Sequence, residues 1–138
     1  MKIDEVIIFD IDGVVITTPS WKSDIIHDDG YSDFNPKCVK NLNETLADTG
    51  YDIVLSSSRR KNVDIDQMNI YFKNRGIKAN IVAYVPEYNV KTRREEIEMF
   101  IEEYKPINYL IMDDDKSLSD LKEEIKTKWI QTYPMIGL

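Results

Sequence analysis

The chain has 138 residues, a usual size for one compact domain, and carries a formal net charge of −7. This negative charge argues against a general nucleic-acid coat protein, because non-specific affinity for a phosphate backbone comes mainly from clustered Lys and Arg. Hydrophobic residues make up 42% of the sequence, and no apolar stretch approaches the roughly 20 residues that span a bilayer. We therefore expect one domain over residues 1–138 that has no contact with membranes.

The first predicted element is a buried strand near the N-terminus. Residues 6–9 form a continuous apolar run, which is typical of a strand covered on both faces. The run is too short for a signal peptide and follows two acids, so we expect a cytoplasmic location. Asp10 and Asp12 come directly after it, followed by Gly13, which allows a sharp turn. Two carboxylates at a buried strand end are costly unless a cation or a proton shares the site.

A long irregular stretch, Thr17 to Phe34, follows this acidic turn. Loops of that length are usually functional or mobile, and we expect a small flap here. Its aromatic residues either stack on a nucleic-acid base or pin the flap to the core, and both readings stay open: Trp21, Tyr31 and Phe34. His27 is more typical of a loop residue than of a metal ligand, because it is the one His of the sequence.

Helices and strands alternate through the rest of the chain. Helical spacing of apolar residues covers 39–46, 65–72, 97–104 and 118–125, and apolar strands are expected at 53–55, 81–85 and 110–112. Helix starts are expected at Asn35, Asp64, Thr92 and Ser117, and helix stops at Gly50, Gly76 and the pair Lys105 and Pro106. This alternation predicts an α/β fold, a three-layer, doubly wound Rossmann-like sandwich around a central parallel sheet.

In such folds the ligand lies beyond the carboxyl ends of the strands. Acids stand at two of these ends, Asp10 with Asp12 and Asp113 with Asp114. Carboxylate oxygens suit a hard ion such as Mg²⁺, and the lack of a His and Cys cluster disfavours zinc. Such an ion lets an ionised Asp10 approach a phosphate as nucleophile, while Asp12 protonates the leaving oxygen and later activates water.

Two further segments supply groups that suit phosphate binding. The run SSSRR offers the hydroxyls of Ser56 and Ser57 and the guanidinium of Arg60. The start of the helix near residue 93 offers Lys91 and Arg93 as cations that offset developing charge. Each segment alone is typical of a turn or a solvated helix end, and the combination favours a site.

Taken in order, VIIFDIDGVV, IVLSSSRR, KTRREEI and YLIMDDD resemble the four motifs of the haloacid dehalogenase (HAD) superfamily. Over nearly its whole length the chain resembles more narrowly the HAD domain of Swiss Army Knife RNA repair proteins. At motif level it is also similar to the 3′-phosphatase domain of phage polynucleotide kinase. The resemblance implies a HAD-type fold with five parallel strands and a phosphatase activity.

The resemblance also implies roles for individual residues. Asp10 is the expected nucleophile and Asp12 the general acid and base. Ser56 falls on the phosphate-binding hydroxyl, and Arg60 falls on the arginine of a Trp-Arg pair whose tryptophan is replaced by Arg59. The expected Mg²⁺ ligands are Asp10, Asp12, Asp113 and Asp114. The cationic residue is either Arg93 or Lys91, and the sequence leaves this choice open.

Neither position at which HAD enzymes insert a cap domain has room for one here. An open site suits an extended substrate such as an RNA or DNA end, or a site completed by a neighbouring subunit of a homo-oligomer. The leading hypothesis is a Mg²⁺-dependent phosphomonoesterase that forms an aspartyl-phosphate and acts on nucleic-acid 3′-phosphate ends. The alternatives are a nucleotidase or small-metabolite phosphatase capped by oligomerisation, and a non-catalytic phospho-acceptor or binding module.

Overall fold

The computed structural model describes residues 3–138, in which five parallel strands form one sheet in the order β3-β2-β1-β4-β5. The strands are β1 (Glu5–Phe9), β2 (Asp52–Leu55), β3 (Ile81–Tyr84), β4 (Asn108–Asp113) and β5 (Trp129–Gln131). The predicted five-stranded parallel sheet is confirmed. The sequence pattern did not locate β5, because this short edge strand is half-buried to exposed and therefore lacks an apolar run.

Most helix boundaries follow the predicted capping residues. The helices are α1 (Pro36–Thr49), α2 (Ile65–Asn74), α3 (Arg93–Tyr104) and α4 (Glu123–Lys126), with 3₁₀ helices η1 (Ser58–Lys61) and η2 (Lys116–Asp120). The side chains of Asn35, Asp64 and Thr92 each accept a hydrogen bond from a backbone N–H in the first turn of α1, α2 and α3. Gly50 and Lys105 end α1 and α3 in the left-handed conformation.

The predicted helix over residues 118–125 is wrong in its continuity and in its start. Extended backbone at Leu121 separates η2 from α4. The capping residue is Asp115, whose side chain accepts from the N–H of Ser117. Leu118 and Ile125 are nevertheless buried, so their spacing reports burial on the sheet and not one unbroken helix.

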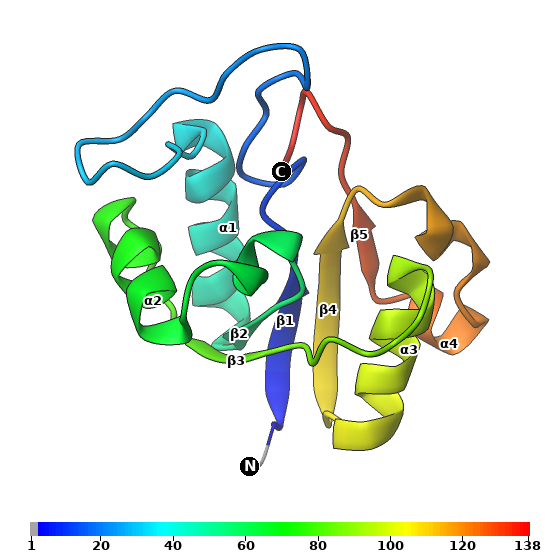
Figure 1. Ribbon diagram of the computed structural model, residues 1–138. Coiled ribbons are helices and arrows are strands. Elements are labelled where there is room, and N and C mark those ends of the chain that lie inside the picture. The colour runs from blue at the N-terminus through cyan, green and yellow to red at the C-terminus, as the bar shows by residue number, and fades with distance from the viewer. Residues whose placement is uncertain (1–2) are drawn as a thin grey trace.

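The order of the strands reverses at β1, and this reversal sets the position of the site. The chain runs outward from β1 through α1, β2 and α2 to β3, and then crosses by α3 to β4 on the other side of β1. Accordingly α1 and α2 cover one face of the sheet, and α3 and α4 cover the other (Figure 1). The carboxyl ends of β1 and β4 therefore lie side by side, and the N–H of Asp10 donates to the carbonyl of Met112 at 3.0 Å.

Within the described residues, no helix has both the length and the apolar character needed to cross a membrane.

The flap, residues 17–34, arches beyond the end of α1 (Figure 1) and is braced from α2. Arg75, at the end of α2, forms an ion pair with Asp29 at 2.7 Å and donates to the carbonyls of Tyr31 and Ser32. The Tyr31 ring stacks on Tyr71 with 4.3 Å between ring centroids.

The flap's other aromatic side chains divide between core and surface. Phe34 is buried in the core between the sheet and α1, and Trp21 is 73% exposed. Tyr31 and Phe34 thus pin the flap to the rest of the domain, which is one of the two alternatives that the sequence left open. Only Trp21, among these aromatic residues, presents a largely exposed ring.

Candidate functional site

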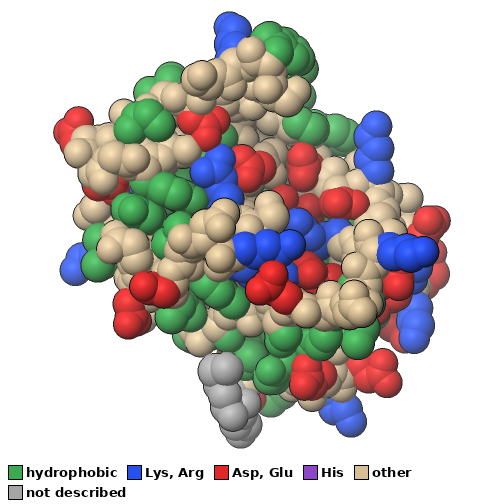
Figure 2. Space-filling view, in the orientation of Figure 1, with side chains coloured by type: hydrophobic (Ala, Val, Ile, Leu, Met, Phe, Trp, Pro, Cys, Tyr) green, Lys and Arg blue, Asp and Glu red, His purple; other side chains and the backbone are tan. Residues whose placement is uncertain are grey.

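Three carboxylates meet where β1 and β4 end. One oxygen from each of Asp10, Asp113 and Asp114 lies within 4.8 Å of the others. Asp113 is fully buried and Asp10 is 6% exposed, whereas Asp114 is half-buried. Figure 2 shows acidic and basic side chains mixed over this part of the surface. We call Asp10, Asp113 and Asp114 the acidic cluster.

Gly13 makes the close approach of Asp114 possible. It has φ of +78°, and a Cβ atom built there would lie 2.1 Å from Oδ2 of Asp114. Any other residue would therefore meet both backbone strain and a clash with the carboxylate. The glycine expected from the sequence to make a sharp turn also leaves room for one of the acids.

Arg93 supplies a positive charge to the cluster. It is the first residue of α3, and its Nη1 lies 2.7 Å from Oδ2 of Asp113 and 3.6 Å from Oδ2 of Asp10. Lys91 is exposed and makes no ion pair within residues 3–138. Of the two cations that the sequence left open, the structure brings Arg93 to the acids.

One guanidinium does not offset the cost of burying these acids. Burial, together with the charge of Asp113, raises the pKa of Asp10 to about 8, although Arg93 and the N–H of Ile11 oppose the shift. Burial also raises the pKa of Asp113 to about 6, and that of Asp114 lies above its usual range for the same reason. The fold thus holds carboxylates that would ionise far more readily with a further cation beside them.

The acidic cluster fits the Mg²⁺ expected from the sequence. All of its ligand atoms are carboxylate oxygens, which are the donors that hard divalent cations prefer. Asp12, the fourth expected ligand, does not place its carboxylate in this cluster. Its two oxygens contact Arg59 instead. Side-chain ligation by the described residues would therefore come from Asp10, Asp113 and Asp114.

The serine run after β2 lies beside β1. The N–H of Ser56 donates to the carbonyl of Phe9, the residue before Asp10. The Ser56 hydroxyl is fully buried and has no hydrogen-bond partner among the described residues. A buried hydroxyl usually has a partner, so this one suits contact with a ligand oxygen. Ser57 is also buried, and its hydroxyl caps η1 by accepting from the N–H of Arg59.

Arg60, predicted to bind substrate, is buried and contacts other parts of the protein. Its side chain is 4% exposed and donates to the carbonyls of Ser56, Ser57 and Val85, with an ion pair to Glu96 at 2.9 Å. These contacts link the serine run to the loop after β3 and to α3. In this arrangement Arg60 fixes the backbone of Ser56 and Ser57.

The contacts of Arg59 were not predicted from the sequence. It stands where the family has a tryptophan, and its Nε and Nη2 donate to the two carboxylate oxygens of Asp12, at 2.8 and 2.9 Å. Nη2 also contacts Asp24 at 2.9 Å, and Nη1 contacts Ser32 of the flap at 3.2 Å. The only signal in the sequence was a second arginine in SSSRR, and its partners depend on how the flap folds back.

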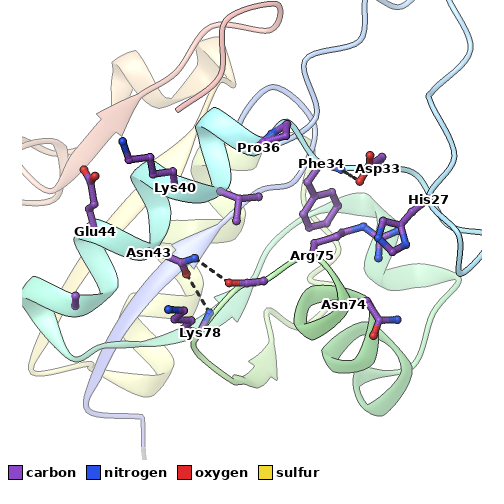
Figure 3. Close-up of a pocket in the computed structure, with 13 residues that line it drawn as sticks. His27, Asp33, Phe34, Pro36, Lys40, Asn43, Glu44, Asn74, Arg75 and Lys78 are labelled. Atoms are coloured by element: carbon purple, nitrogen blue, oxygen red, sulfur yellow. Dashed lines mark hydrogen bonds between the residues drawn. The ribbon is translucent and has the colours of Figure 1, made fainter.

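A groove of about 770 Å³ lies away from these acids, between α1 and the end of α2. It is lined by the stem of the flap at His27 and Phe34 and by Asn43, Arg75 and Lys78, among other residues (Figure 3). Asn43 ties its two walls together by bonding to the carbonyl of Gly76 and the N–H of Lys78. None of the predicted catalytic residues lines this groove, so the site at the strand ends is the candidate for chemistry.

Comparison with protein families agrees with this geometry. Residues 6–138 match the model of the family described as the HAD domain in Swiss Army Knife RNA repair proteins. Searches of the curated proteins and of the solved structures gave no match. The family match supports a hydrolase of the HAD type, consistent with the parallel sheet and with acids at its carboxyl edge. The match covers nearly the whole sequence, and the chain therefore belongs to this family of HAD domains.

Proposed function

We propose that this protein is a Mg²⁺-dependent phosphomonoesterase that acts on the 3′-phosphate ends of RNA or DNA through an aspartyl-phosphate intermediate. The single observation that carries the proposal is the acidic cluster at the ends of β1 and β4, with Arg93 against it. The family description, which names RNA repair, supports the choice of nucleic-acid ends. We further propose that residues 1–138 act as one domain with a small flap.

Asp10 is the nucleophile in this proposal. Its carboxylate lies at the end of the central strand, where the N–H of Ile11 fixes Oδ1 at 2.9 Å and leaves Oδ2 toward Arg93. Asp10, Asp113 and Asp114 would hold Mg²⁺, which when bound neutralises carboxylate and phosphate charge. Oδ2 then attacks phosphorus, the P–O bond to the leaving group breaks, and the phosphoryl group passes to Asp10.

Other side chains hold the phosphoryl group during this transfer. The unpartnered Ser56 hydroxyl is suited to donate to a phosphoryl oxygen, and the guanidinium of Arg93 is suited to offset negative charge that develops on it. Asp12 protonates the leaving oxygen, and its carboxylate later takes a proton from the water that hydrolyses the aspartyl-phosphate. Arg60 acts indirectly, because it holds the carbonyls of Ser56 and Ser57.

The openness of the site favours an extended substrate. The insertion between β1 and α1 is a flap pinned to α2, and the link from β3 to α3, residues 85–92, is short. Neither provides a cap domain that would enclose a small metabolite. A nucleic-acid end can extend away from such a site while its terminal phosphate reaches Asp10.

The direct test is Mg²⁺-dependent phosphate release from an aryl phosphate and from oligonucleotides phosphorylated at the 3′ or the 5′ end. We expect release from the aryl phosphate and from the 3′ ends, and loss of both when Asp10 is replaced by Asn. Release from 5′ ends and 3′ ends at equal rates would contradict the 3′ preference. No release from any substrate would contradict the phosphatase itself.

A second candidate is a nucleotidase or small-metabolite phosphatase whose site is capped by a second copy of the chain. The flap favours it, because Trp21, Ile25 and Ile26 are 73%, 75% and 60% exposed and would be suited to an interface. A solution mass measured by light scattering separates the candidates. An oligomer that hydrolyses mononucleotides faster than oligonucleotide ends would replace the leading proposal by this one.

A further inference from the structure

Arg59 joins the flap to the carboxylate of Asp12. Its guanidinium donates to both carboxylate oxygens of Asp12, at 2.8 and 2.9 Å, and also to Asp24 and Ser32 on the flap. The Tyr31 hydroxyl, also on the flap, accepts from Nη1 at 3.4 Å. All of these contacts come from one side chain, which therefore links the carboxylate of Asp12 to the flap. We call this connection the Arg59 clamp.

The strength of the clamp follows from its geometry. Two parallel N–H···O bonds between a guanidinium and a carboxylate form one of the stronger polar contacts in proteins. The side chains of Arg59 and Asp24 are 22% and 25% exposed, whereas that of Asp12 is 52% exposed, so water screens the Asp12 end of the clamp more than the flap end. The hydroxyl of Ser32 also donates to Asp24 at 2.6 Å, which fixes the flap end of the clamp.

The clamp conflicts with the role of Asp12 in the proposed reaction. A carboxylate that protonates a leaving oxygen needs one of its own oxygens directed at that atom. In the structure both oxygens are directed at Arg59, and the carboxylate of Asp12 is outside the acidic cluster. Asp12 therefore has to leave Arg59 before it reaches the substrate.

We infer that Arg59 is a positioning residue that holds Asp12 against the flap, so that breaking the Arg59–Asp12 pair also loosens the part of the flap that Arg59 contacts. This inference rests on the proposed function for the role of Asp12, but the clamp itself does not. It implies that a substitution of Asp12 loosens the flap, because Arg59 connects the two. It also implies that Arg59 restrains the step that needs Asp12 as a proton donor.

Arg75 provides a matched control. Like Arg59, it holds the flap, through Asp29 and the carbonyls of Tyr31 and Ser32, and its guanidinium stacks over the Phe34 ring (Figure 3). Unlike Arg59, it contacts neither Asp12 nor the acidic cluster. We therefore expect Arg75→Gln to loosen the flap at Asp29 without breaking the Arg59–Asp12 pair.

The first arm of the test follows amide hydrogen exchange of the flap by mass spectrometry, with the full chain in Mg²⁺. We expect Asp12→Asn and Arg59→Gln each to speed exchange across residues 24–32 by about fivefold or more, since each breaks the same pair. The double variant should exchange no faster than Arg59→Gln, because both substitutions act on one contact. Asp10→Asn should leave the flap unchanged. A flap that is indifferent to Asp12→Asn would overturn the inference.

The second arm compares phosphate release from an alkyl phosphate, which needs a proton on its leaving oxygen, with release from an aryl phosphate, which needs it less. We expect Arg59→Gln to raise the alkyl-to-aryl ratio of kcat/KM about threefold to tenfold, because Arg59 no longer holds the carboxylate of Asp12 away from the substrate. Arg75→Gln should leave the ratio unchanged, although it also loosens the flap. An unchanged or lower ratio in Arg59→Gln would contradict the inference that Arg59 restrains proton donation by Asp12.

The two arms of the test distinguish failure of the proposed function from failure of the inference about Arg59. If no substrate releases phosphate, the proposed function is wrong, and the exchange arm still decides whether Arg59 couples Asp12 to the flap. If Arg59→Gln does not fold, the comparison of Asp12→Asn with Asp10→Asn decides the same point in the exchange arm. If phosphate is released but neither arm responds to Arg59→Gln, the phosphatase stands and the clamp is refuted.

Discussion

The buried and exposed sides of the site differ in how their acids are neutralised. On the buried side, three carboxylates share the guanidinium of Arg93, and burial raises the pKa of each. On the exposed side, the guanidinium of Arg59 contacts both oxygens of Asp12 and one of Asp24, whose pKa is lowered by the Ser32 hydroxyl and by Arg59. The buried side is short of positive charge and suits a metal ion, whereas the acids of the exposed side are already paired with Arg59.

Replacing the buried cation should have the largest effect. We expect Arg93→Gln to lower kcat by about 10²–10³-fold, because it removes the cation beside Asp10 and Asp113 that would offset phosphoryl charge in the proposed reaction. Lys91→Ala is the matched control, since Lys91 is two residues away and exposed. It should change kcat by less than about twofold, as surface substitutions usually do. Steady-state kinetics on an aryl phosphate decide the point, and a large effect of Lys91→Ala with none of Arg93→Gln would reverse the assignment.

The contact between Gly13 and Asp114 can be broken without removing any acid. We expect Gly13→Ala to weaken Mg²⁺ binding about 10–100-fold, because the new Cβ displaces the Asp114 carboxylate. Gly30→Ala is the control, since Gly30 has φ of +86° and nothing lies within 4 Å of the Cβ position. It carries the same kind of backbone strain, about 1–2 kcal/mol, without the clash. Equal Mg²⁺ affinities of the two variants in calorimetry would show that Asp114 is not a ligand.

The charge shortage of the buried side should appear as a pH dependence of stability in the absence of metal. Since the folded-state pKa of Asp10 lies near 8 and that of Asp113 near 6, both above the ordinary value of 3.8, the folded state binds more protons than the unfolded state. The contribution of these two groups to the free energy of unfolding is therefore largest below about pH 4, and it falls as pH rises to about 8. We expect the loss to be on the order of a few kcal/mol.

Urea unfolding with EDTA present, across this pH range, measures that loss. Asp10→Asn should flatten the dependence, because the amide does not ionise, and Mg²⁺ should flatten it in the native protein by stabilising the ionised carboxylates. Asp24→Asn, on the exposed side, provides the comparison. It should leave the pH dependence of the free energy of unfolding above pH 5 unchanged. A metal-free protein whose stability rises between pH 5 and 8 would contradict the account of the buried side.

The sequence predicted the buried side of the site better than the exposed side. Asp10, Asp113 and Asp114 follow apolar strands, and the rule that parallel strands end at one edge is enough to bring them together. Arg93 was one of two candidates, because sequence spacing does not show which side chain of a first helical turn faces the sheet. The fifth strand was expected only from the resemblance to a family, since Trp129–Gln131 lacks an apolar run.

The contacts of the exposed side depend on loop geometry that has no periodic signal. Nothing in SSSRR distinguishes Arg59, which reaches Asp12 and the flap, from Arg60, which is buried against Glu96. The difference arises because η1 turns the two neighbouring side chains in different directions. The pairing of Arg59 with Asp24 further requires the flap to fold back over some 35 positions of sequence separation, which no local pattern predicts.

The central claim is that Asp10 accepts the phosphoryl group, and acid quenching during turnover followed by peptide mass analysis tests it directly. The protein is mixed with Mg²⁺ and an aryl phosphate, quenched in acid and digested. We predict the mass of one added phosphoryl group on the peptide that contains Asp10, more of it in Asp12→Asn because hydrolysis lacks its base, and none in Asp10→Asn. Phosphate release by the native protein with the phosphoryl group on another residue, or with activity retained in Asp10→Asn, would contradict the account.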